Sequence, residues 1–216
     1  MTAISPTIPS LRAGSIGAWR GAALLAVALA AVVAARWSAT RLGLDSVAVG
    51  GAFGVGLFLI ALIAPGDPPK TGEHHLADVA RRAVPAIAIG SAVGLAFVAT
   101  SVVGPALAGV ERVPGLGRPA APFVPWALVN VLVASAEEAV LRGVLFDRVA
   151  HAGGAALALA VTTCAFALLH VPLYGWQVVP LDFAVGLCLG GLRMATRSVA
   201  APAAAHIVAD LATWWL

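Results

Sequence analysis

Long apolar stretches alternate with short polar connections along the whole chain. A helix that crosses a bilayer needs about 20 apolar residues, and seven stretches are of this order. They cover residues 21–35, 46–66, 83–110, 121–150, 154–170, 179–192 and 198–216. The pattern therefore predicts an all-α fold, a polytopic transmembrane helical bundle of about seven helices.

The first stretch holds only 15 residues, between Arg20 and Arg36. Long arginine side chains can reach the two membrane interfaces, so a short stretch is sufficient for a span. An apolar stretch behind arginines also resembles a signal peptide. We favour an uncleaved first helix, because Arg36 follows the apolar stretch directly and the chain stays hydrophobic afterwards.

Composition agrees with a membrane protein. Hydrophobic residues make up 61% of the chain and charged residues 11%, and the mean hydropathy is +0.97. These values exclude a soluble enzyme. The net charge of +3 comes from scattered Lys and Arg with no basic run, which excludes a nucleic-acid partner. Cys164 and Cys188 lie in apolar runs and are predicted to be buried, inert thiols.

The chain divides into N-terminal transmembrane helices and loops over 1–120 and a catalytic helical core over 121–216. Two connections have appreciable length, 66–82 and 111–122. Positive charges gather on the cytoplasmic side of membrane proteins, and a cytoplasmic N-terminus places nine Lys and Arg inside and four outside. The Ala- and Gly-rich composition indicates a bacterial inner membrane as the location.

Charged residues interrupt two of the apolar stretches. Glu137, Glu138 and Arg142 lie in the fourth stretch and Asp210 in the last. Each costs about 2.5 to 3.5 kcal/mol at the centre of a membrane helix. Such residues therefore face the interior of the bundle or a water-filled cavity, and they indicate a functional site. Glu138 and Arg142 are four residues apart, the favoured spacing for an ion pair. Glu137 lies about 100° around the helix and is free for chemistry.

Two histidines are predicted to reach the same depth as these acids. At 1.5 Å per residue, Glu137 and His170 lie about 20 and 24 Å from the turn that joins their helices. From the same side of the membrane, His206 and Asp210 lie about 14 and 20 Å deep. Histidines that only made separate interhelical hydrogen bonds would have no reason to share this depth, so we predict that the four residues form a common site. We interpret Asp182, near the start of the sixth stretch, as a helix-start residue stabilised by the helix dipole.

Three short motifs carry a family resemblance. In chain order, they fit the patterns EExxxR, FxxxH and HxxxN or HxxxD, at residues 137–142, 166–170 and 206–210. Together they resemble the CPBP family of intramembrane endopeptidases, which includes type II CAAX prenyl endopeptidases and bacteriocin-processing or immunity proteins. The likeness covers about residues 122–216.

The resemblance implies a role for each residue of the site. Glu137 would be the general base, His170 its partner on the attacking water, and His206 with Asp210 would stabilise the oxyanion. Asp210 stands where the eukaryotic CAAX enzymes carry Asn. An ionised Asp cannot donate a hydrogen bond to an oxyanion, so Asp210 could instead orient His206.

Two questions stay open on sequence alone. The first is metal dependence: His170, His206 and Asp210 could hold Zn²⁺ with Glu137 as base, although we favour a mechanism without a cofactor because HExxH is absent. The second is activity. The favoured function is hydrolysis of a membrane-associated peptide or protein near its hydrophobic or lipidated end. The alternative is a non-catalytic membrane immunity or scaffold protein, while transport is disfavoured because no inverted repeat is visible.

Overall fold

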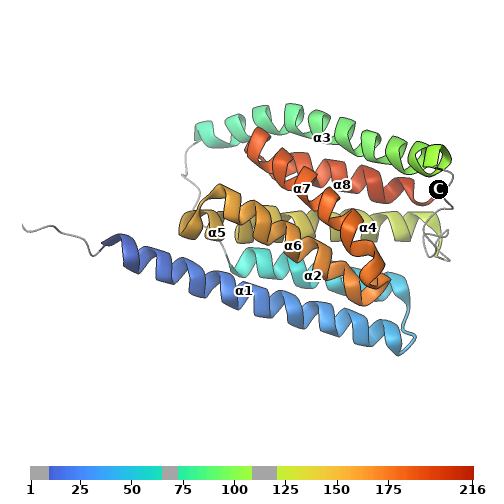
Figure 1. Ribbon diagram of the computed structural model, residues 1–216, viewed down its shortest axis with the longest axis horizontal. Coiled ribbons are helices and arrows are strands. Elements are labelled where there is room, and N and C mark those ends of the chain that lie inside the picture. Colours follow the sequence, from blue (N-terminus) through green and yellow to red (C-terminus); the bar gives the residue numbers. More distant parts are fainter. Residues whose placement is uncertain (1–9, 65–72, 109–120) are drawn as a thin grey trace, which may run out of the picture.

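A computed structural model describes residues 10–64, 73–108 and 121–216 of the chain, with side chains over 16–64, 81–103 and 121–216. Of the two predicted connections, residues 66–72 and 111–120 fall outside the described residues, whereas residues 73–82 are helical. The described residues are almost entirely helical, and Figure 1 shows them as a bundle of elongated helices.

The predicted all-α fold is confirmed. Over the described ranges the elements are α1 (Ser10–Arg41), α2 (Ser46–Ile63), α3 (Glu73–Ala108), α4 (Phe123–Glu138), the π-helix η1 (Ala139–Leu145), α5 (Phe146–Gly153), α6 (Ala155–Tyr174), the 3₁₀-helix η2 (Trp176–Val178), α7 (Val179–Thr196) and α8 (Ala200–Ala212). Because α4, η1 and α5 follow one another without a break, they form one long helix. The elements therefore make seven rods.

Within the described part of the chain, six helical segments are long and apolar enough to cross a membrane. The protein is therefore an integral membrane protein. The seventh rod, α8, has 13 residues, or about 20 Å of helix. It is therefore shorter than the predicted last span. The first rod is longer than its apolar stretch, since α1 continues past Arg36 to Arg41.

The turn between α5 and α6 fixes the hairpin on which the depth calculation rested. Gly154 has a φ of 88°, a conformation that glycine adopts at no steric cost. Its backbone N–H donates to Ala150 O at 2.8 Å and ends α5. Helix α6 then begins at Ala155, so the predicted turn is confirmed.

The helices before residue 120 cover the core formed by those after it. In Figure 1, α1 and α2 lie along one edge of the bundle and α3 along the other, with α4 to α8 between them. Helix α3 packs along α8, α2 along α4, and α1 along α5. Leu25 and Leu29 of α1 are 2% and 3% exposed, so the predicted first helix is part of the core.

Helices α3 and α8 approach each other closely at two glycines of α3. A Cβ atom built on Gly94 would lie 2.6 Å from Ala205 O, and one built on Gly90 would overlap Ala201 O. The obstructing atoms belong to the backbone, which cannot rotate away as a side chain can. Glycine is therefore required at both points where α3 meets the backbone of α8. The contact of Gly94 is with Ala205, the residue before His206.

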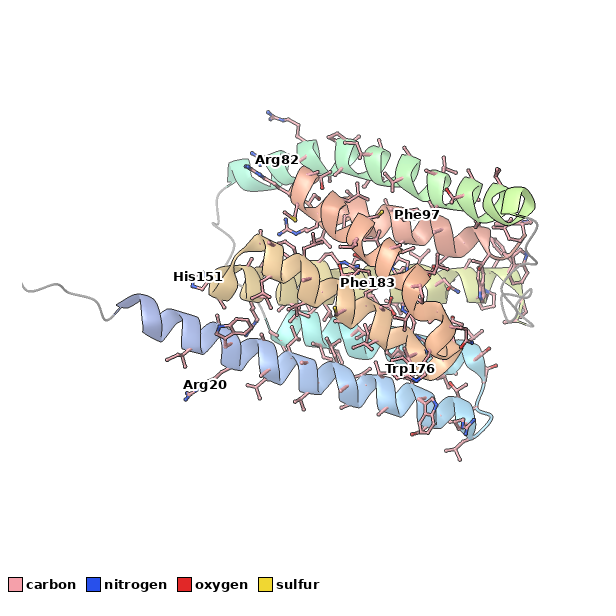
Figure 2. All side chains as sticks on the ribbon, in the orientation of Figure 1. Arg20, Arg82, Phe97, His151, Trp176 and Phe183 are labelled. Atoms are coloured by element: carbon pink, nitrogen blue, oxygen red, sulfur yellow. The ribbon has the colours of Figure 1, made fainter. Side chains whose placement is uncertain are left out.

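The two ends of the bundle differ in chemistry. Figure 2 shows Arg20, Arg82 and His151 at one end and Trp176 toward the other.

The two cysteines lie on the outside of the bundle. Cys164 and Cys188 are free but exposed, so the prediction of buried thiols was wrong. An apolar run in a membrane protein faces lipid as readily as it faces the core.

Aromatic rings join the start of α4 to the end of the chain. The ring centroids of Phe123 and Trp126 lie 5.2 and 5.1 Å from that of Trp214. Trp214 is only 8% exposed, whereas Trp215 is 70% exposed. Trp215 therefore has the exposure of an aromatic anchor at the membrane interface, whereas Trp214 packs inside.

Candidate active site

Glu138 connects two of the other predicted site residues. Its Oε1 accepts a hydrogen bond from Arg142 Nη1 at 2.8 Å and lies 3.0 Å from His206 Nδ1. The side chains of Glu138 and Arg142 are both 0% exposed, and the predicted ion pair is confirmed. Because an ionised carboxylate only accepts hydrogen bonds, His206 carries a proton on Nδ1. Glu138 thus fixes the tautomer of an imidazole from another helix.

A π-helix begins directly after Glu138. This wider helical turn is rare and is frequent at functional sites. In η1, the backbone carbonyl of Arg142 accepts a hydrogen bond from Arg193 Nε at 2.8 Å, and Arg193 Nη2 also bonds Asp147 Oδ1 at 2.9 Å. The Arg142 side chain donates to Gly186 O at 3.3 Å. Helix α7 therefore supports both the backbone and the side chain of Arg142.

Phe166 is the aromatic residue of the FxxxH motif, and its ring lies at the centre of the site. The Arg142 guanidinium carbon lies 4.6 Å from the centroid of the Phe166 ring, the arrangement of a cation–π contact. The rings of His170 and His206 meet it edge-on, with centroids 4.8 and 5.4 Å away. One ring therefore sets the spacing of three polar groups.

The hydrogen bonds of His170 define its tautomer. His170 Nδ1 lies 2.9 Å from Phe166 O, and a carbonyl oxygen can only accept. Nδ1 therefore donates, and Nε2 of the neutral ring keeps its lone pair. Nε2 is available to accept a hydrogen bond from a water molecule.

Asp182 was missed as a site residue. It lies in the first turn of α7, as predicted, but its Oδ2 is also 3.4 Å from His170 Nδ1. The pairing joins two helices across a short turn, so no spacing within one helix could reveal it. The sequence did contain a signal for this pair: His170 lies shortly before Gly175 and Asp182 shortly after it, so a turn at Gly175 would bring the two side chains together.

Two carboxylates flank the other nitrogen of His206. Asp210 Oδ2 lies 3.6 Å and Glu137 Oε2 3.9 Å from His206 Nε2. Glu137 is 3% exposed, while the Asp210 side chain is 34% exposed. Asp210 is therefore the more accessible of the two carboxylates. Among the side chains described, Glu137 makes no hydrogen bond or ion pair with His170. Their predicted partnership thus requires a water molecule between them rather than direct contact.

The predicted zinc ligands do not form a recognisable metal site. Across the residues with described side chains, no group of three or more His, Cys, Asp and Glu is arranged to hold a metal ion. His170 pairs with Asp182, whereas His206 and Asp210 pair with each other.

Fold and site together define a class: a polytopic membrane protein whose helical bundle encloses an acid–imidazole cluster. Residues 119–212 match the family model described as type II CAAX prenyl endopeptidase Rce1-like. The segment that carries the three motifs is therefore similar to this family, and the family resemblance predicted from those motifs is confirmed. Comparison with curated proteins and with solved structures gives no significant match.

Proposed function

We propose that the protein hydrolyses a peptide bond near the hydrophobic or lipidated end of a membrane-associated substrate. The observation that carries this proposal is the meeting of His170 and His206 at the Phe166 ring, with Glu137 beside His206, inside an apolar bundle. Peptide hydrolysis needs a base for water, a donor for the oxyanion and an acid for the leaving amine. One carboxylate and two imidazoles can supply all three.

The proposed reaction begins with a water molecule between Glu137 and His170. Glu137 removes a proton as the water oxygen attacks the scissile carbonyl, while the free Nε2 of His170 accepts the second hydrogen bond and orients the water. Collapse of the tetrahedral intermediate breaks the C–N bond, and the proton taken from water passes to the leaving amine. Proton transfer by a positioned side chain contributes about 10²- to 10⁴-fold in rate.

The geometry of His206 constrains its proposed role at the oxyanion. Its Nδ1–H points to Glu138, so only a ring protonated on both nitrogens has an Nε2–H for the oxyanion. Glu137 and Asp210 near Nε2 supply the negative charge that such a ring requires. This supports Asp210 as the residue that orients His206.

Isotope labelling tests hydrolysis directly. The protein is reconstituted in liposomes with membrane-anchored test peptides, one prenylated near its C-terminus and others with apolar C-terminal segments, in water enriched in ¹⁸O. We expect mass spectrometry to find a shortened peptide with ¹⁸O in its new carboxylate. Intact peptides throughout, from protein that is folded by thermal unfolding, would contradict the proposal and favour the scaffold alternative.

A further inference from the structure

Asp182 is a partly buried acid whose surroundings differ from those of a helix cap. Helix α7 has no side-chain cap hydrogen bond at its N-terminus. The Asp182 side chain is 14% exposed, and its Oδ2 is buried without a hydrogen-bond partner. A buried polar atom without a partner is costly, so dipole stabilisation at the helix start does not account for this residue.

The group that compensates Asp182 is the His170 ring. The distance from Asp182 Oδ2 to His170 Nδ1 is 3.4 Å, and the Nδ1–H points to Phe166 O at 2.9 Å. Two acceptors thus lie on the same side of the imidazole, and both favour a proton on Nδ1. Glu137, His206 and Asp210 are also within electrostatic range of Asp182, so this carboxylate belongs to the cluster.

We propose that Asp182 is a positioning residue that holds His170 with Nε2 toward the attacking water. This inference rests on the proposed hydrolysis. Phe166 O fixes the tautomer from within α6, and Asp182 adds a negative charge from α7 beside the same nitrogen. A carboxylate behind an imidazole orients the ring and stabilises positive charge that develops on it. Asp182 itself touches neither water nor substrate.

The connection between the two helices makes this arrangement rigid. Only Gly175 and the three residues of η2 separate α6 from α7. Gly175 has a φ of 83°, which glycine accommodates without strain. His170 and Asp182 therefore lie on two helices joined by a tight turn, which limits their relative motion.

The test compares Asp182→Asn and Asp182→Glu with Asp45→Asn, which removes an exposed carboxylate at the N-cap of α2, a position that Asn caps as well as Asp. We expect Asp182→Asn to lower kcat about 10²-fold with KM nearly unchanged, Asp182→Glu to recover part of the loss, and Asp45→Asn to keep wild-type kcat. The ¹⁵N NMR signals of His170 should change in Asp182→Asn and stay unchanged in Asp45→Asn.

Two outcomes separate this inference from the proposed function. If wild type cleaves, but Asp182→Asn matches its kcat and leaves the His170 signals unchanged, the positioning role is wrong and hydrolysis stands. If wild type does not cleave, the proposed function fails, while a change in the His170 signals still supports the contact. Loss of thermal stability in Asp182→Asn with no partial recovery in Asp182→Glu would indicate a purely structural residue.

Discussion

At the scale of single residues, the site is a group of acids around two imidazoles and one arginine. Glu138 binds both Arg142 and His206, so removal of one partner affects the other two. Such a buried group is stable only while its charges are paired and hydrogen-bonded. The consequences of single substitutions therefore depend on which charge is left alone.

Arg142→Ala should destabilise the fold before it affects chemistry. The substitution leaves Glu138 without its cation in a fully buried position, which typically costs about 3 to 5 kcal/mol. We expect a clearly lower unfolding temperature in detergent. Arg41→Ala, which removes an exposed arginine, is the control and should unfold like wild type. An Arg142→Ala protein that is as heat-stable as wild type but inactive would place Arg142 among the catalytic or substrate-binding residues.

Asp210→Asn separates the two mechanisms that use the same residues. Without a metal, Glu137 still supplies negative charge beside His206 Nε2, and the amide of Asn can donate a hydrogen bond where Asp cannot, so activity should survive. Treatment with 1,10-phenanthroline should also leave cleavage intact. Stoichiometric zinc in wild type by elemental analysis, lost together with activity in Asp210→Asn, would overturn this prediction and leave Glu137 as the base beside a metal-bound water.

Residue spacing predicted the contacts made within one helix and the shared depth of the polar residues, but not which side chains meet between helices. Glu138 and Arg142 are four residues apart, so a helical period alone brings them together. The contacts of Glu138 with His206 and of His170 with Asp182 join different helices. These contacts depend on how the helices rotate and pack against one another, which the spacing of residues within one helix does not determine.

At the scale of elements, apolar length predicted how many helices form but not where each ends. Helix α6 was predicted to end at His170 because Val171 and Pro172 follow, yet it continues to Tyr174. Proline lacks the backbone N–H of a regular helical turn, and membrane helices tolerate this loss because neighbouring groups can satisfy the freed carbonyl. The π-helix after Glu138 was also unforeseen, since it reflects tertiary packing around Arg142.

The α3–α8 contact predicts an unusual sensitivity to one methyl group. Gly90→Ala would drive a Cβ into the backbone of Ala201, and overpacking of this kind costs about 1 to 3 kcal/mol. We expect lower thermal stability and reduced cleavage, because α8 carries His206. Gly191→Ala makes the same chemical change where a Cβ meets nothing within 4 Å, and it should behave like wild type. Equal stability of the two variants would show that α3 does not fix α8.

At the scale of the whole molecule, the bundle has an arginine-rich end and an aromatic end. The charge census predicts that the arginine-rich end and the N-terminus face the cytoplasm, and seven rods place the C-terminus on the other side. A reporter that is active only in the cytoplasm should work at the N-terminus, and one that is active only outside should work at the C-terminus. The reverse pattern would contradict this orientation.

The central claim is that the buried acids and imidazoles perform hydrolysis rather than hold the bundle together. The most direct measurement is cleavage by Glu137→Gln in liposomes, at protein amounts and unfolding temperatures matched to wild type. Because Gln keeps the shape of Glu137 but cannot accept the proton, we predict a rate at least about 10²-fold below wild type. A Glu137→Gln protein that is equally folded and cleaves at close to the wild-type rate would contradict the account.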